Sequence, residues 1–117
     1  MITLAIGKQR IELIPLESGE EVWSGIEIEK THHDSEGSWI GLRKSLLDIA
    51  LLRKVKFLNI KVKDNDLEIT IPPAEFVSKS KPMEMPSKYS GTYQLYLYPI
   101  SDRIIENFKK KNAQKPN

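Results

Sequence analysis

Several short stretches of this chain alternate between hydrophobic and polar residues, which is the period of strands that bury one face. Two such runs lie between residues 2 and 16, on either side of Gly7-Lys8, and predict an N-terminal hairpin. Residues 21–30 predict a third strand, with Val22, Ser24, Ile26 and Ile28 on its inner face. Trp23 falls on the other face together with Glu27 and Glu29, so we expect its side chain to be exposed.

Residues 42–54 have the composition and period of a helix. One stripe, at i, i+4, i+7 and i+8, consists of Leu42, Leu46, Ile49 and Ala50. Further leucines, Leu47, Leu51 and Leu52, make the helix apolar around most of its circumference. Such a helix is either deeply buried or offers a second surface to a partner.

Residues 55–71 predict a second hairpin, with a turn at Asn65-Asp66. This turn would pair Lys63 with Glu68 and Val62 with Ile69. The apolar residues Leu58, Ile60, Val62, Leu67, Ile69 and Ile71 then share one face. Lys61 and Lys63 lie on the other face, so we expect these lysines to meet water.

Two stretches have the composition of loops. Residues 31–38 are polar throughout, and residues 72–91 contain four prolines. We expect the second to be a long loop that Phe76, Met83 and Met85 attach in places to the fold.

An aromatic strand at residues 92–98 and a helix at residues 101–111 complete the predicted elements, and residues 112–117 form a frayed basic tail. The chain is thus predicted to be a single α+β domain over residues 1–111. Its elements follow the order β-β-β-α-β-β-β-α. We expect a curved antiparallel sheet or a small, partly open barrel, packed by two helices.

The composition is that of an ordinary globular protein: 39% of the 117 residues are hydrophobic and 29% are charged. The chain has no cysteine, which excludes disulfides, thiolate metal sites and a cysteine nucleophile. No apolar run approaches the length of a membrane span, and the N-terminus does not resemble a signal peptide. We therefore expect a cytoplasmic protein that has no membrane partner.

Catalytic and metal-binding signals are weak. One cluster has suitable ligand types, namely His32, His33, Asp34 and Glu36. However, adjacent histidines on an extended chain point to opposite sides. The chain contains neither a Gly-x-Ser-x-Gly elbow nor a glycine-rich phosphate loop. We expect no enzyme, no catalytic residue, no metal and no cofactor, and leave binding of a small ligand open.

Single-stranded nucleic acid is one candidate partner. Lys56, Lys61 and Lys63 are expected on the outer face of the second hairpin, and Tyr96 and Tyr98 share a face of the last strand. Lysines that meet phosphates and tyrosines that stack on bases would together bind a single strand.

Another protein, or a second copy of this chain, is the candidate that we favour. Leu47 and Leu51 are i, i+4 neighbours that could form a groove or a dimer seam. Trp23 and Trp39 would add the residue type most enriched at interface hot spots. The alternative is that these leucines simply belong to the core. The predicted function is a non-enzymatic interaction module, such as an accessory, assembly or inhibitor protein.

Overall fold

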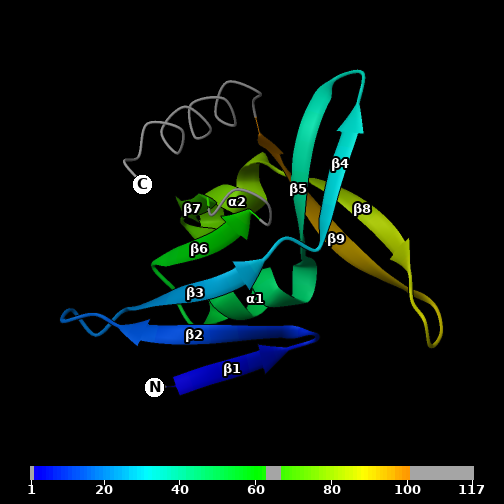
Figure 1. The fold of residues 1–117 in the computed structure, drawn as a ribbon. Coiled ribbons are helices and arrows are strands. Elements are labelled where there is room, and N and C mark those ends of the chain that lie inside the picture. Colours follow the sequence, from blue (N-terminus) through cyan, green and yellow to red (C-terminus); the bar gives the residue numbers. More distant parts are fainter. Residues whose placement is uncertain (1, 63–66, 101–117) are drawn as a thin grey trace, which may run out of the picture.

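The computed structural model describes residues 2–62 and 67–100, and within them the chain forms two β-sheets and two α-helices (Figure 1). The first sheet, sheet A, contains β1 (Ile2–Ile6), β2 (Gln9–Pro15), β3 (Glu21–Glu27), β6 (Phe57–Val62) and β7 (Leu67–Ile71). Sheet B contains β4 (Lys30–Asp34), β5 (Gly37–Arg43), β8 (Lys81–Pro86) and β9 (Thr92–Ile100). The helices are α1 (Lys44–Leu52) and α2 (Pro73–Lys79). The α+β class is confirmed, and the helix and tail predicted after residue 100 lie outside the described residues.

Sheet A has the strand order β1-β2-β3-β6-β7 and begins with the predicted N-terminal hairpin. The strands β3 and β6 are parallel, whereas we expected antiparallel pairing throughout. Parallel neighbours need a long crossover connection. Here the crossover consists of β4, β5 and α1, which the chain passes through between β3 and β6.

Sheet B is antiparallel, has the order β4-β5-β9-β8, and curls into a half-barrel, as the sequence predicted for a curved or partly open sheet. Its β4–β5 hairpin corrects the prediction of a loop at residues 31–38. The Glu36 N–H donates a hydrogen bond to Asp34 Oδ1 at 2.8 Å, and Gly37 has a φ of +146°, so a tight turn joins the two strands. The polar composition reflects an edge strand whose side chains are largely exposed.

The prediction of a long loop at residues 72–91 is also wrong, because this segment forms α2 and β8. Prolines did not prevent either element. Pro73 stands in the first turn of α2, where no backbone donor is needed. Pro82 and Pro86 lie on β8, an edge strand, which tolerates the missing N–H groups.

Trp23 is fully buried, although the alternation of β3 placed it on the exposed face with Glu27. The register between β3 and β6 shifts between Trp23 and Ile26, and Gly25 has a φ of +79°. This irregularity is a β-bulge, and a bulge re-aims the side chains that follow it. Trp23 and Ile26 therefore both point into the core, with 0% of their surface exposed.

The β6–β7 hairpin forms with a register two residues away from the predicted one. Lys61 pairs with Glu68 and Ile60 pairs with Ile69. A shift by two residues preserves the side-chain alternation. Leu58 and Ile60 are accordingly buried and Lys61 is exposed, as expected. Lys63 and the predicted turn at Asn65-Asp66 lie outside the described residues.

The predicted central helix is confirmed as α1, with shorter bounds. Leu42 belongs to β5, and Leu46, Leu47 and Ala50 are the buried residues of the helix. Together with Phe76 of α2 they belong to the main core, to which both sheets also contribute buried residues.

Candidate functional site

The four residues predicted to bind a protein do not form one surface. Trp23 and Leu47 are fully buried in the main core, and Trp39 is only 8% exposed. The indole N–H of Trp23 donates to Glu21 Oε1 at 3.2 Å. Leu51 is 42% exposed on the outer side of α1. The expectation that these tryptophans and leucines gather on the outside is wrong, because Trp23 and Leu47 belong to the main core and Trp39 is buried in sheet B.

Four of the residues predicted to bind nucleic acid are described, and they are also separated. Lys56 and Lys61 are exposed beside and on sheet A, whereas Tyr96 and Tyr98 lie on β9 in sheet B. Both tyrosines are half-buried against the main core. Tyr98 stacks on Phe76, with the ring centres 5.1 Å apart. The tyrosine rings thus face the helices and do not form a stacking platform beside these lysines.

The other face of sheet B, which we name the tryptophan face, is apolar at its centre and lies away from both helices. The pairing of Gly41 with Leu97, of Met83 with Leu95 and of Met85 with Tyr93 places these residues on one side of the sheet. Its apolar members are Trp39, Met83, Met85, Tyr93, Leu95 and Leu97. Trp39, Leu95 and Leu97 are buried without belonging to the main core, so sheet B buries apolar side chains on both faces.

The curl of sheet B makes this second burial feasible. A β-carbon added at Gly41 would lie 3.0 Å from Leu97 Cδ2 and 3.3 Å from the carbonyl oxygen of Lys30. Leu97 therefore occupies the space that any side chain at position 41 would need. Glycine here allows the strands to close around the leucine side chains of β9.

Lys81 covers the tryptophan face at its edge. Its ammonium lies 3.7 Å from the centre of the Trp39 ring and 3.4 Å from Asp34 Oδ2. His32 Nε2 lies 3.1 Å from the same carboxylate oxygen, and its ring centre is 5.6 Å from that of Trp39. Although desolvation raises the pKa of Asp34, hydrogen bonds from the Glu36 N–H, His32 and Lys81 hold this pKa below its ordinary value.

Arg43 lies at the other end of the tryptophan face. Its guanidinium carbon is 4.4 Å from the centre of the Tyr93 ring, and its Nε is 2.8 Å from Glu29 Oε1. A cation over an aromatic ring is attracted by the negative charge of the ring face. Arg43 therefore fixes Tyr93, which stands where the β8–β9 hairpin leaves the body of the protein.

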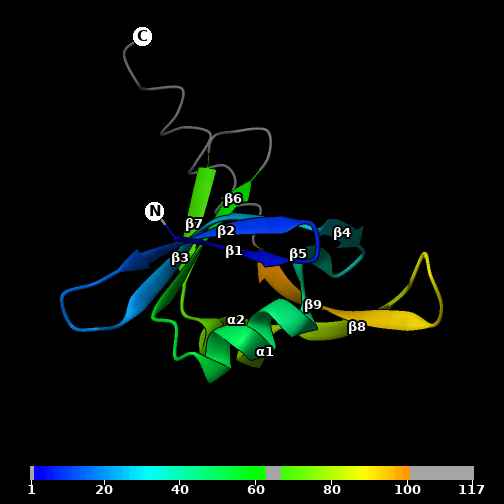
Figure 2. The same ribbon diagram turned by 90° about the horizontal axis from the view of Figure 1, so that it is seen from below.

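The β8–β9 hairpin, which we name the arm, extends away from the rest of the molecule (Figures 1 and 2). Its tip, residues 87–91, is ordered by hydrogen bonds from the Ser87 N–H to the Gly91 carbonyl at 3.0 Å and from the Tyr89 N–H to Ser87 Oγ at 3.3 Å. Gly91 has a φ of +69°, which glycine adopts without strain. Tyr89 is 96% exposed at this tip.

The two sides of the arm differ in polarity. Met83, Met85 and Tyr93 form the apolar side, which is continuous with the tryptophan face. Glu84 and Thr92 lie on the polar side, where the threonine hydroxyl donates to the carboxylate at 2.6 Å. The arm is thus an amphipathic ribbon with an exposed aromatic residue at its end.

The sequence predicted a loop where the arm stands. The signal of the arm was the alternation of Lys81, Met83 and Met85, which the neighbouring Pro82 and Pro86 concealed. The turn-forming run Ser87-Lys88-Tyr89-Ser90-Gly91 was a second signal.

His32 and His33 point to opposite sides of β4, as predicted for an extended chain. His32 contacts Asp34, whereas His33 Nδ1 lies 2.7 Å from Ser38 Oγ. Within residues 2–62 and 67–100, no three side chains of the types His, Cys, Asp or Glu come together as a potential metal site.

The fold and the surface define an α+β protein with a curled, two-faced sheet and a protruding arm. Comparisons with family models, with curated proteins and with solved structures find no match for this chain. In the part of the chain that the structure describes, neither helix is long and apolar enough to cross a membrane.

Proposed function

We propose that this protein is a non-enzymatic protein-binding module that grips its partner with the arm. The observation that carries the proposal is the 96% exposure of Tyr89 at the hydrogen-bonded tip of the arm. Tyrosine is enriched at interface hot spots, and it supplies a large contact area at a small cost in side-chain entropy. The tip combines it with serine and glycine, the composition of many binding loops.

The apolar side of the arm extends this contact surface. Met83, Met85 and Tyr93 are half-buried, so each keeps surface that a partner can cover. Methionine side chains adapt to the shape of a partner because they are unbranched and flexible. Tyr89 and this apolar side would together fill a groove in the partner. This mode of binding suits the inhibitor or assembly role that the sequence predicted.

The cation at the tip of the arm favours a groove with an acidic rim. Lys88 is exposed there, whereas Arg43 and Lys81 flank the apolar side as members of ion pairs with Glu29 and Asp34. Opposite charges across an interface steer association and select the partner. We further propose that this binding occurs in the cytoplasm, which a chain without cysteine fits.

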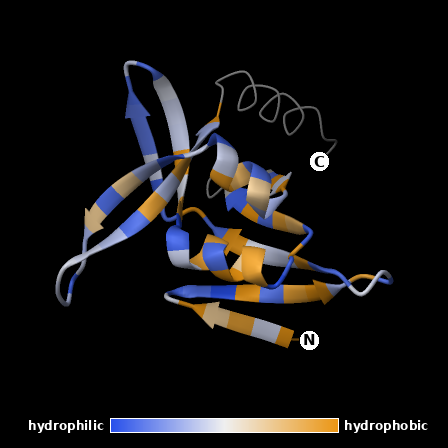
Figure 3. Ribbon diagram, turned by 180° about the vertical axis from the view of Figure 1, so that it is seen from behind, coloured by the Kyte–Doolittle hydropathy of each residue, from blue (hydrophilic) through white to orange (hydrophobic). Residues whose placement is uncertain are grey.

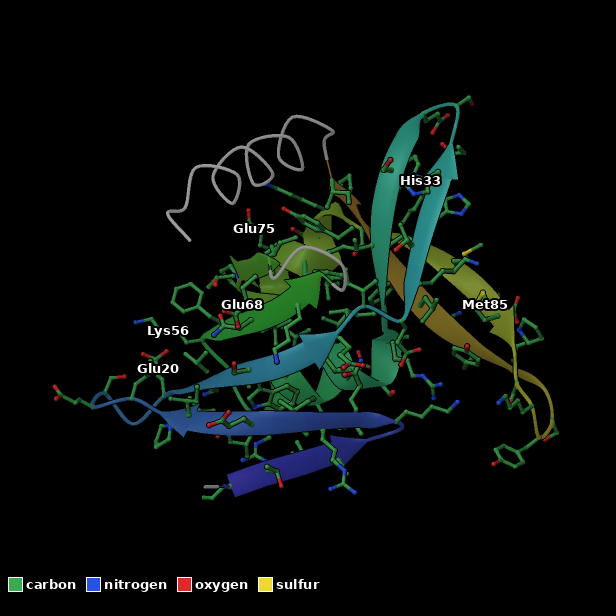
Figure 4. All side chains as sticks on the ribbon, viewed as in Figure 1. Glu20, His33, Lys56, Glu68, Glu75 and Met85 are labelled. Atoms are coloured by element: carbon green, nitrogen blue, oxygen red, sulfur yellow. The ribbon has the colours of Figure 1, made fainter. Side chains whose placement is uncertain are left out.

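Site-specific photocrosslinking in the source cells tests the proposal. We would replace Tyr89 by p-benzoylphenylalanine and compare it with the same replacement at Glu20. Glu20 lies in another exposed loop, far from Met85 and the arm (Figure 4). The expected result is a discrete protein adduct from position 89 and none from position 20.

A second variant tests the apolar side of the arm. Changing Met85 to Glu in the position-89 crosslinker should remove the adduct, because a charge would be buried in the partner's groove. Equal crosslinking from positions 20 and 89, or none from either, would refute the proposal. An adduct with nucleic acid in place of protein would favour the alternative predicted from the sequence.

A further inference from the structure

The free edge of β1 differs from the other free edges of the described sheets. β4 and β8 end sheet B, and β1 and β7 end sheet A. Edge strands that avoid pairing with other chains usually carry charges, prolines or bulges. β4 has Lys30 and Asp34, β7 has Glu68, and β8 has Lys81, Glu84 and two prolines.

β1, by contrast, has the sequence Ile-Thr-Leu-Ala-Ile, without any charge, proline or glycine. It pairs with β2 in an uninterrupted register, so no bulge twists its edge away. Figure 3 shows no strongly hydrophilic residue along this strand. Ile2 is 67% exposed although it shares a face with the buried Ile6. In the described part of the chain, β1 therefore has none of the charges, prolines or bulges that protect an edge strand.

The turn after β1 determines which backbone groups of the strand are free. Only Gly7 and Lys8 separate the paired residues Ile6 and Gln9, and Gly7 has a φ of +58°. In a two-residue hairpin the flanking residues exchange both of their backbone hydrogen bonds. The backbone groups of Ile6, Leu4 and Ile2 thus point to β2. Those of Thr3 and Ala5 point outward, to the open edge.

We propose that two copies of this chain pair antiparallel through their β1 strands and join their A sheets into one continuous sheet. A two-fold axis at Leu4 pairs Thr3 of each copy with Ala5 of the other. This register uses the N–H and C=O groups of both residues in both copies, which gives four hydrogen bonds across the axis. It also places Ile2 beside Ile6 of the second copy and covers its exposed surface.

The charges next to β1 favour this symmetric register. Within one copy, Ala5 pairs with Arg10 and Thr3 pairs with Glu12. Across the axis, Arg10 of one copy and Glu12 of the other fall in the same row, with only Ala5 and Thr3 between them. These small side chains allow the long charged ones to lean toward each other. Arg10 of one copy and Glu12 of the other therefore attract each other. No like charges stand opposite each other on the paired strands.

A matched pair of double variants tests this dimer by sedimentation equilibrium over a range of protein concentrations. Thr3 and Ala5 are exposed, and within one copy a lysine at position 3 would face Glu12 while one at position 5 would face Arg10. These two effects oppose each other, so we expect the double lysine variant to keep the fold of one copy. In the dimer of the variant Thr3→Lys with Ala5→Lys, the lysine at position 3 of each copy faces the lysine at position 5 of the other copy. Thr3→Lys with Ala5→Glu sets lysine opposite glutamate instead. We expect the first variant to weaken dimerisation about tenfold or more and the second to dimerise at least as well as the original chain.

Amide hydrogen exchange of the unmodified chain gives a readout that needs no variant. Exchange of the Thr3 and Ala5 amides should slow as the protein concentration rises, because these N–H groups become bonded in the dimer. The proposal is overturned if the original chain stays monomeric at high concentration, or if both variants dimerise equally. Exchange of these two amides that does not depend on protein concentration would overturn it too. In that case an extended segment of another protein would be the remaining candidate to pair with the edge of β1. The tip of the arm lies away from β1 (Figure 1), so Tyr89→Ser should not change the dimer, and the two proposals can fail separately.

Discussion

The ammonium of Lys81 lies 3.7 Å from the centre of the Trp39 ring, and this contact closes the tryptophan face of sheet B. Lys81 also reaches Asp34 on β4 at 3.4 Å. β4 and β8 are the two outer strands of this sheet, with β5 and β9 between them. In a flat sheet, strands three places apart are separated by about 14 Å. The ion pair between them therefore reports how strongly the sheet curls.

The contact of Lys81 with Asp34 should be lost in acid. The pKa of Asp34 lies below its ordinary 3.8, so the stabilising contribution is complete above pH 3.8 and disappears as the pH falls through the lowered pKa. We expect the indole resonance of Trp39 to shift with a midpoint below pH 3.8. Asp34→Asn should remove the transition, and its persistence would show that another group causes it.

The substitution Gly41→Ala should destabilise the protein by about 1–3 kcal/mol through overpacking. The added methyl group would lie 3.0 Å from Leu97 Cδ2 and 3.3 Å from the carbonyl oxygen of Lys30. Because backbone stands on this second side, the methyl group cannot shift away from the leucine. Chemical denaturation measures this loss. Ser90→Ala, at an exposed position in the tip of the arm, is the control and should change stability by less than about 0.5 kcal/mol. If both substitutions changed the free energy of unfolding equally, the strands of sheet B would be able to move apart around the new methyl group without loss of stability.

Gln9→Ala should cost about 1–3 kcal/mol, because it leaves backbone groups without partners. Gln9 is 7% exposed, its Nε2 donates to the carbonyl of Glu27 at 2.6 Å, and its Oε1 accepts the Glu27 N–H at 3.0 Å. The side chain thus completes the pairing of β3 just after its bulge. Gln94→Ala, on the exposed side of the arm, should be nearly neutral in the same denaturation experiment. A neutral Gln9→Ala would mean that water replaces the amide.

The helix α1 offers a comparison of two leucines only five residues apart. Leu47→Lys should prevent folding or cost more than about 4 kcal/mol, because it buries a charge in the main core. Leu52→Lys should change stability by less than about 0.5 kcal/mol, since Leu52 is 83% exposed. Circular dichroism during thermal unfolding distinguishes the two. Retention of the fold by Leu47→Lys would revive the predicted binding surface around Leu47 and Leu51.

Local pattern in the sequence determined the elements whose signal is contained within a few residues. The β1–β2 hairpin, the β6–β7 hairpin and α1 were predictable because alternation and the 3.6-residue period depend only on neighbouring side chains. Even the wrong register of β6 and β7 kept Lys61 outside and Ile60 inside, because a slip by two residues preserves the faces.

The tertiary structure alone decided which of these elements meet. Trp23 is inside because of the bulge at Gly25, and the sequence pattern of β3 contains no information on a bulge beyond a single glycine. Residues 81–86 became a strand because β9 was there to pair with them, despite their prolines. The pairing of β8 with β9 also forms the arm, and Tyr89 is exposed at its tip. Pairing between distant strands depends on the geometry of the whole sheet, and for this reason the candidate surface could be recognised only after folding.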